Sequence, residues 1–406
     1  MSAHTPDNFY RIRRLPPYVI AEVNAMRAAA RAGGEDIIDL GMGNPDLPPP
    51  PHVIEKLVEV TRKPGAHGYS QSKGIPGLRR AQANYYARRF GVELDPEREV
   101  VVTMGSKEGL ASLATAITAP GDVVLAPNPS YPIHTFGFII AGATIRAVPT
   151  TPDEAYFESL ERAMAFTVPR PSVLVMGYPS NPTAEVVDLA FYERVVAFAK
   201  EQGLWVISDL AYSELYYDGR PTPSILQVPG AKEVAVEFTS LSKTYSMAGW
   251  RIGFGVGNER LIAAMTRVKS YLDYGAFTPI QAAACAALNG PQDIVEENRA
   301  LYHKRRDVLV ESFARAGWDI PSPSASMFAW APLPPALQHL GSLEFSKQLL
   351  THAHVAVAPG VGYGENGEGF VRIAMVENEQ RLRQAARNVK RYLQSMGVNA
   401  PGRRTG

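Results

Sequence analysis

The sequence has little of several features that mark whole classes of protein. Its 406 residues include one cysteine, Cys285, so no intramolecular disulfide can form, which favours a reducing compartment. In its run of alanines, Cys285 is expected to be a buried helix residue. Lysine and arginine number 41 against 40 acidic residues, which argues against nucleic acid as the main partner. Neither a metal-binding histidine spacing nor a Walker-type phosphate loop is present.

Long apolar runs are also absent. The segment 136–145 is interrupted by glycines and is shorter than the about 20 residues that span a bilayer. The first residues, Met1-Ser-Ala-His-Thr-Pro-Asp, lack the charged and then apolar pattern of a secretory signal. With 46% hydrophobic and 20% charged residues, the composition is that of an ordinary globular protein. We therefore expect a cytoplasmic protein of more than one domain.

The middle of the chain alternates short β-branched segments with longer segments of helical apolar spacing. Strands are expected at 100–103, 123–126, 171–177, 204–208 and 233–238, and a helix at 189–202. Continuous apolar strands separated by helices are typical of a mostly parallel sheet covered on both faces. Ligands of such sheets bind at the carboxyl ends of the strands. Ser106, Asn181, Asp209 and Lys243 follow strands, so we expect them at one edge of one sheet.

The two ends of the chain differ from the middle. Helices are expected at 18–32, 293–315 and 378–396, and short strands at 327–330 and 370–375. The proline-rich segment 47–51 is a stiff connector and a plausible domain boundary. We expect a large domain over residues 46–285. Residues 1–45 and 286–406 would form an N-terminal arm and a smaller domain.

Lys243 and Asp209 are the first candidates for chemistry. Lys243 follows a buried strand, where burial lowers the pKa of an ammonium group and makes the amine a nucleophile. A solvated surface lysine is the alternative. Asp209 ends an apolar strand, where a carboxylate needs a partner such as a protonated pyridine nitrogen, unless it is a helix N-cap. Tyr212, about one turn later, could reach the same ligand.

A second group of residues suggests a phosphate site. Gly105-Ser-Lys-Glu-Gly lies at a strand-to-helix turn, where a helix N-terminus offers free N–H groups and a positive dipole end. Ser106 would add a hydroxyl and Lys107 a cation, although Ser106 could simply cap the helix. Arg251, eight residues after Lys243, is either a bidentate phosphate ligand or part of a surface ion pair.

Arg372 is an arginine in the middle of an expected apolar strand, so it requires an anion. The α-carboxylate of a substrate fits the planar guanidinium group, and an ion pair with Glu377 or another acid is the alternative. Gly41-Met-Gly-Asn-Pro-Asp46 predicts a tight turn with exposed N–H groups, or merely a loop. Tyr69 and Tyr131 could equally be buried aromatic residues.

Together these residues resemble the pyridoxal 5′-phosphate (PLP) aminotransferases of fold type I, class I and II, over nearly the whole chain. The specific motifs are Ser240-Leu-Ser-Lys243-Thr-Tyr-Ser-Met-Ala-Gly-Trp-Arg251-Ile-Gly, Asn181-Pro-Thr, Asp209-Leu-Ala-Tyr212 and Gly43-Asn-Pro-Asp. The match looks closest to the bacterial alanine (glutamate–pyruvate) aminotransferases, with LL-diaminopimelate aminotransferases as near relatives. Four segments support this: Arg11-Ile-Arg-Arg-Leu-Pro-Pro-Tyr-Val, His67-Gly-Tyr-Ser-Gln-Ser-Lys-Gly-Ile-Pro, Asn128-Pro-Ser-Tyr-Pro-Ile-His and Lys269-Ser-Tyr-Leu-Asp-Tyr-Gly.

The resemblance implies an α/β fold whose large domain has a mostly parallel seven-stranded sheet, beside a smaller α/β domain. It also implies a homodimer with active sites at the subunit interface. Lys243 would hold PLP as a Schiff base and shuttle the proton, and Asp209 would pair with the pyridinium nitrogen. The other implied cofactor contacts are Tyr212 and Asn181 on the ring oxygen, Tyr131 on the ring, and Ser106, Lys107, Ser240, Ser242 and Arg251 on the phosphate, helped by Tyr69 of the partner subunit.

The expected reaction is a ping-pong transamination of L-alanine with 2-oxoglutarate to pyruvate and L-glutamate, a step of amino-acid metabolism. Arg372 would bind the substrate carboxylate, together with Asn181 and the backbone at Gly43. The alternatives are an LL-diaminopimelate or other aminotransferase, a PLP-dependent C–S lyase and a PLP-binding transcription regulator. The short arm does not supply the DNA-binding segment that a regulator needs. For the distal carboxylate of glutamate, Arg13, Arg14 and Lys269 remain unranked candidates.

Overall fold

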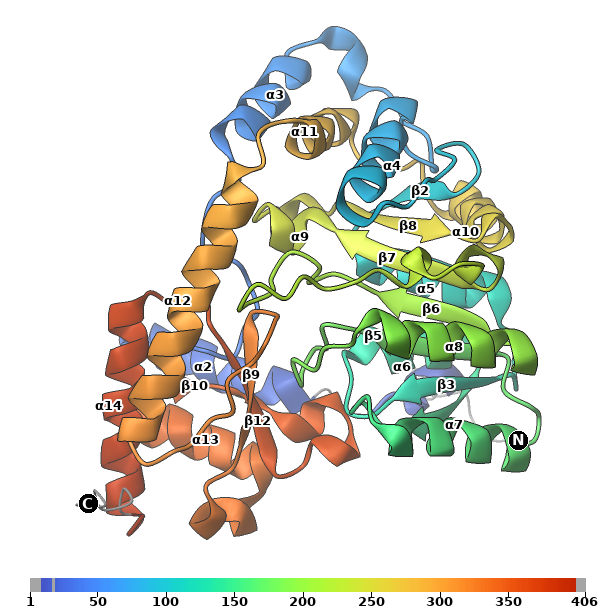
Figure 1. Ribbon diagram of the computed structural model, residues 1–406. Helices are drawn as coiled ribbons and strands as arrows, with labels where there is room; N and C mark the ends of the chain where they lie inside the picture. The colour runs from blue at the N-terminus through green and yellow to red at the C-terminus, as the bar shows by residue number, and fades with distance from the viewer. Residues whose placement is uncertain (1–8, 17–18, 399–406) are drawn as a thin grey trace.

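The structure is a computed structural model that describes residues 9–16 and 19–398. Its largest sheet has seven strands in the order β2-β8-β7-β6-β5-β3-β4 (Figure 1). Only β8 runs antiparallel to its neighbours, which confirms the expected seven-stranded, mostly parallel sheet. The bounds are β2 (Val100–Thr103), β3 (Val123–Pro127), β4 (Thr144–Val148), β5 (Val173–Gly177), β6 (Trp205–Asp209), β7 (Ala235–Ser240) and β8 (Gly253–Gly257).

Helices cover both faces of this sheet, as its continuously apolar strands require. One face packs against α5 (Ser106–Ile117), α6 (Pro132–Ala141) and α10 (Glu259–Leu272). The opposite face packs against α4 (Pro76–Phe90), α7 (Glu154–Phe166), α8 (Leu189–Gln202) and α11 (Thr278–Asn289), and α3 (Pro51–Thr61) packs on α11. Cys285 lies in α11 but is half-buried rather than buried, and burial raises the pKa of its thiol to about 11.

Two smaller sheets form a second cluster of buried apolar residues. A parallel pair joins β1 (Ile38–Asp39) to β10 (Val355–Ala356), and an antiparallel sheet has the order β11-β12-β9. Its strands are β9 (Phe328–Pro332), β11 (Ala358–Pro359) and β12 (Phe370–Ala374), and the surrounding helices are α2 (Val19–Ala32), α12 (Asp293–Arg315), α13 (Gly341–Ala353) and α14 (Glu379–Ser395). The remaining short helices are α1 (Tyr10–Arg13), α9 (Leu241–Thr244) and the 3₁₀ turns Pro64–His67, Ile225–Gln227, Ala231–Glu233, Ala248–Trp250, Pro335–Leu340, Gly360–Tyr363 and Glu365–Gly367.

Local sequence accounts for where many helices begin and end. Asp153 and Asp188 accept backbone N–H groups at the starts of α7 and α8. Gly91, Gly142 and Gly203 take left-handed conformations at the ends of α4, α6 and α8, which glycine adopts without strain. The expected helices at 189–202 and 293–315 have the predicted bounds.

The long helix α12 connects the two parts of the fold. Figure 1 shows it running from the end of α11, past the seven-stranded sheet, to the smaller sheets. Its polar side chains contact segments that follow the strands: Asn298 donates to the carbonyl of Thr244 in α9 at 3.2 Å, and Arg299 donates to the carbonyl and to Oε2 of Glu214, each at 3.0 Å. The domain boundaries at 46 and 285 stay a prediction. Within the described residues, no helix has the length and apolar character to cross a membrane.

Candidate active site

A cavity of about 610 Å³ lies at the carboxyl edge of the seven-stranded sheet, between that edge, β9, β12 and the loop after β1. It is lined by all but one of the predicted site residues, namely Gly43, Ser106, Lys107, Tyr131, Asn181, Asp209, Tyr212, Ser240, Ser242, Lys243, Arg251 and Arg372. Tyr69 does not line it. The side chain of Tyr69 is 88% exposed, and its ring lies 4.6 Å from that of Tyr274. Its predicted place in a partner's site stays a prediction.

The start of α5 forms one end of the cavity. Gly105 is the N-cap with φ 84°, and Ser106 donates from Oγ to the carbonyl of Thr239 at 3.2 Å instead of capping the helix. The simple capping interpretation of Ser106 is therefore wrong. A Cβ on Gly105 would lie 2.2 Å from Nη2 of Arg251, so only glycine lets this arginine approach the helix end.

Ser240, Ser242 and Arg251 surround the same end. Ser240 accepts the N–H of Ser242 at 3.1 Å and donates to Oγ of Ser242 at 2.8 Å. Arg251 is exposed and donates to the carbonyls of Ala248 at 2.8 Å and Met104 at 3.3 Å. No acidic side chain of the described residues pairs with Arg251, so the surface ion pair is wrong. Two hydroxyls, a guanidinium and a helix N-terminus suit a bound phosphate.

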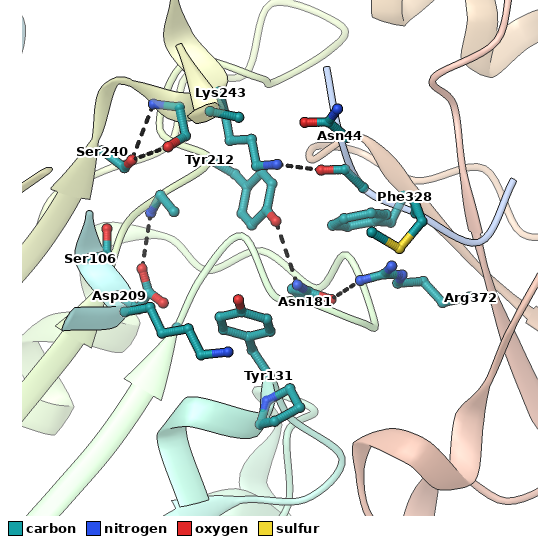
Figure 2. A pocket seen from close by; sticks show the side chains of 18 of the residues that line it. Asn44, Ser106, Tyr131, Asn181, Asp209, Tyr212, Ser240, Lys243, Phe328 and Arg372 are labelled. Atoms are coloured by element: carbon teal, nitrogen blue, oxygen red, sulfur yellow. Dashed lines mark hydrogen bonds between the residues drawn. The ribbon is translucent and has the colours of Figure 1, made fainter. Parts of the chain in front are cut away.

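Lys243 projects from α9 into the cavity, as Figure 2 shows, and donates from Nζ to the carbonyl of Gly43. Burial, and then the positive charges of Arg372 and Arg251, lower the pKa of Lys243 to about 7. The interpretation as an ordinary surface lysine is therefore wrong. At neutral pH a large fraction of this amine is unprotonated and able to act as a nucleophile.

Asp209, at the end of β6, has two partners in the cavity wall. Its Oδ2 lies 2.9 Å from Nε2 of His134, and its Oδ1 accepts the N–H of Ala211 at 3.3 Å. The residues directly after Asp209, 210–216, form no helix, so the N-cap alternative is wrong. His134, in the first turn of α6, was missed by the sequence analysis because no spacing links it to position 209. Its other ring nitrogen, Nδ1, is buried without a partner.

Asn181 connects the middle of the cavity to Arg372. It donates from Nδ2 to the hydroxyl of Tyr212 at 3.5 Å, and its Oδ1 accepts from Nη1 of Arg372 at 2.8 Å (Figure 2). Burial raises the pKa of Tyr212 far above its usual range, so its hydroxyl stays protonated. Tyr131 lies opposite Tyr212, and Nζ of Lys107 is 5.8 Å from the centre of its ring.

Arg372 is 7% exposed, and its hydrogen-bond and ring partners among the described residues are neutral groups. Nη2 donates to the carbonyl of Gly41 at 2.8 Å, and the guanidinium lies 3.9 Å from the ring of Phe328 and 5.0 Å from that of Tyr363. No described acidic residue pairs with it, so the ion pair with Glu377 is wrong. Its Nε is buried without a partner. A buried guanidinium with a donor to spare has the chemistry to accept a carboxylate.

The three candidates for a distal carboxylate lie outside the cavity. Lys269 is fully buried and pairs with Glu108 at 3.1 Å and Asp273 at 2.9 Å. Arg14 donates to backbone carbonyls, the shortest of them that of Ala143 at 2.6 Å, and Arg13 is exposed. The sequence analysis also missed the apolar wall of the cavity, formed by Ile20, Phe328 and Tyr363. No chemistry-bearing motif marks these positions.

The sequence matches the family "Aminotransferase class I and II" over residues 35–389. The chain belongs to this family. It is 64% identical to a Rhizobium meliloti protein named "Putative aminotransferase AatC", over 96% of each chain. It is 53% identical to the glutamate-pyruvate aminotransferase AlaC of Escherichia coli, over 96% of this chain and 95% of the relative. An LL-diaminopimelate aminotransferase of Moorella thermoacetica is 44% identical, over 94% and 97%.

This aminotransferase also matches a solved structure closely. The substrate-bound BacF structure of Bacillus subtilis superimposes with a TM-score of 0.91 at 35% identity, covering 96% of this chain and 98% of that one. The match confirms the predicted fold type I architecture. The family implies PLP, and the cavity fits this cofactor. The start of α5, with the Arg251 guanidinium packed against Gly105, suits the phosphate, and the buried carboxylate of Asp209 suits a protonated ring nitrogen.

We predict that the apoprotein reacts with pyridoxal, which lacks the phosphate, with a rate that rises with pH about a midpoint near 7. The reason is that only the unprotonated amine of Lys243 attacks an aldehyde, and burial, followed by the charges of Arg372 and Arg251, lowers its pKa to about 7. Stopped-flow absorbance at a series of pH values measures this, with Lys243→Met as the blank. Arg372→Met should move the midpoint upward, and a wild-type midpoint above 9 would contradict the assignment.

Proposed function

We propose that this aminotransferase uses L-alanine and 2-oxoglutarate, giving pyruvate and L-glutamate in two half-reactions of a ping-pong cycle. The observation that carries the proposal is the 53% identity, over 96% of the chain, to a relative named glutamate-pyruvate aminotransferase. The buried guanidinium of Arg372 supports an α-amino acid substrate of any kind. The apolar residues beside it, Ile20, Phe328 and Tyr363, favour a small side chain.

The residues around the cavity would hold PLP in the following way. The phosphate would lie at the start of α5, bound by Ser106, Lys107, Ser240, Ser242 and Arg251, and the ring would lie against Tyr131 with Tyr212 and Asn181 at its oxygen. When bound, PLP supplies an electron sink for the charge that develops on the substrate Cα. The carboxylate of Asp209 would keep the ring nitrogen protonated, because a nearby opposite charge raises the pKa of a cation.

Lys243 would act as the general base. Its amine, with a pKa near 7, is matched to accepting the proton from the substrate Cα near neutral pH and to returning it later. The carbonyl of Gly43 would hold this amine whenever it is free. Arg372 would fix the α-carboxylate, with Asn181 and the backbone at Gly43, and so orient the Cα–H bond for proton transfer.

A second candidate substrate is LL-diaminopimelate, favoured by the 44% identical relative that carries this activity in its name. A C–S lyase on the same fold would use the same lysine, aspartate and arginine. Neither alternative requires a different cofactor. The test must therefore separate substrates and not only detect PLP.

We predict that kcat/KM for L-alanine with 2-oxoglutarate exceeds that for LL-diaminopimelate by about 100-fold or more, because the apolar wall of Ile20, Phe328 and Tyr363 offers no partner to the distal ammonium group of LL-diaminopimelate, which L-alanine and 2-oxoglutarate lack. Coupled assays with L-alanine, L-glutamate and LL-diaminopimelate, against pyruvate and 2-oxoglutarate, measure these constants. L-cystathionine without an oxo acid is the control for C–S cleavage. A preference for LL-diaminopimelate, or steady pyruvate release from L-cystathionine, would overturn the alanine assignment.

We predict that Asp209→Ala slows the half-reaction with L-alanine by about 10²- to 10³-fold once the enzyme is loaded with PLP, since it removes the charge that stabilises the protonated ring. The dissociation constant of PLP should change far less, because the phosphate contacts remain. Single-turnover absorbance and equilibrium dialysis measure the two quantities. Ser242→Ala is the matched control and should show the reverse pattern. Equal, mild effects of Asp209→Ala on both quantities would mean that Asp209 has only a structural role.

We also propose a homodimer in which the partner's Tyr69 reaches the phosphate. The supporting observation is an exposed aromatic and apolar surface, formed by Tyr69, Tyr271, Leu272, Tyr274 and Phe277. A monomer rarely leaves such a patch in water. Because Tyr69 does not line the cavity of its own chain, it is available to a second copy.

We predict that mixing inactive Lys243→Ala with weakened Tyr69→Ala restores activity, because each mixed dimer contains one native site. An equal mixture should regain about one quarter of the wild-type sites after subunit exchange. Activity at limiting PLP and the mass by sedimentation equilibrium measure this. A chain that sediments at 44.2 kDa, or mixtures no more active than their components, would contradict the shared site.

A further inference from the structure

The loop of residues 39–46 joins β1 to α3 and supplies two acceptors to the cavity. The carbonyl of Gly41 accepts from Nη2 of Arg372, and the carbonyl of Gly43 accepts from Nζ of Lys243. The loop is packed tightly, since a Cβ on Gly43 would lie 2.5 Å from the ring of Phe328. A small displacement of this loop would therefore move the carbonyl of Gly41, which holds the guanidinium of Arg372.

The 39–46 loop is held at both ends by an aspartate. At the first end, Asp39 pairs with Arg27 at 2.5 Å and accepts the N–H groups of Gly41 at 3.1 Å and Met42 at 3.3 Å. The first end of the loop is therefore fixed to β1 and α2. The position of the rest of the loop depends on how its second end is held.

At the second end, Asp46 forms a two-bond pair with Arg305 of α12, in which Nη1 and Nη2 each lie 2.7 Å from a carboxylate oxygen. The side chain of Arg305 is 4% exposed, and Nη1 also donates to the carbonyl of Met375 at 3.2 Å. Asp46 is three residues after Gly43, and Met375 is three residues after Arg372. One guanidinium on α12 thus bridges the loop to the chain segment that carries the substrate-binding arginine.

We propose that Asp46 and Arg305 are positioning residues, which fix the 39–46 loop against β12 so that the carbonyl of Gly41 aims Arg372 at the substrate carboxylate. This inference rests on the role proposed for Arg372. A two-bond carboxylate–guanidinium pair fixes rotation as well as distance, which one hydrogen bond does not. Neither residue contacts the cavity itself, so both act through the loop.

The chain offers a matched control on the next residue of α12. Arg306 is also buried and forms a two-bond pair with Asp218, at 2.6 Å and 3.2 Å, and Asp218 is half-exposed. This pair is also a two-bond carboxylate–guanidinium pair, but it does not touch the 39–46 loop, and Arg306 has a second acidic partner, Asp307, at 2.8 Å. Asp46→Asn and Asp218→Asn therefore each remove one carboxylate charge that pairs with an arginine of α12. They differ in whether the loop loses its anchor.

We predict that Asp46→Asn raises the KM for L-alanine, and the dissociation constant of unreactive propionate, by about tenfold with little change in kcat, because it weakens carboxylate binding in all states equally. Propionate binding is measured from the absorbance of the bound cofactor. In the apoprotein, hydrogen exchange should rise in a peptide covering 40–47 and not in one covering 240–245. Asp218→Asn should match wild type in all of these.

Arg305→Lys provides the second variant, because it keeps a buried positive charge but cannot form the two-bond pair with Asp46. It should reproduce the effects of Asp46→Asn, and it carries the test if that variant does not fold. Equal effects of Asp46→Asn and Asp218→Asn, or a lower melting temperature with unchanged propionate binding, would overturn the inference. Arg372→Lys separates the two proposals. If Arg372→Lys binds propionate as tightly as wild type does, the role of Arg372 is wrong, and the inference about Asp46 is wrong with it. If Arg372→Lys loses propionate binding while Asp46→Asn retains it, only the inference about Asp46 is wrong.

Discussion

The site depends on two cations that are removed from water without an acidic partner. Lys243 and Arg372 share one cavity and donate to neutral oxygen atoms, those of Gly43, Gly41 and Asn181. Because no described carboxylate neutralises them, each favours the unprotonated or anion-bound state that the chemistry needs. Burial and mutual repulsion lower the pKa of Lys243, and the same conditions make Arg372 receptive to a carboxylate. Acidic partners beside either one would cancel both effects.

The fold produces this arrangement because the seven-stranded sheet and the smaller antiparallel sheet meet at the cavity. The seven-stranded sheet ends its parallel strands at a common border, which gathers Ser106, Asp209 and Lys243 from distant parts of the sequence. The smaller sheet contributes Arg372 from β12. The 39–46 loop passes between them, and its carbonyls are the neutral acceptors. The acidic residues of that loop, Asp39 and Asp46, lie at its two ends and pair with Arg27 and Arg305 instead of with the cations of the cavity.

Much of the site could be predicted from sequence, because strand ends are local signals. Lys243 and Asp209 follow apolar strands, so their common edge follows from the strand order alone. The contact between His134 and Asp209 could not be predicted, since it depends on how α6 packs against the sheet and joins residues 75 positions apart in the sequence. Lys269 is the opposite case, a candidate from the sequence that lies outside the cavity. Its sequence context gives a lysine but not its partners, and packing places it between Glu108 and Asp273, away from substrate.

The contacts of α12 have a consequence for how this chain can vary. Asn298, Arg299 and Arg305 each contact a different segment beside the site, namely α9, the loop after β6 and the 39–46 loop, over two turns of one helix. An α-helix turns by about 100° per residue, so inserting or deleting a single residue between them would rotate one contact away from its loop while leaving the others in place. Descendants of this chain can therefore exchange side chains on the outer surface of α12, but its length between positions 298 and 305 is constrained by the geometry of the site.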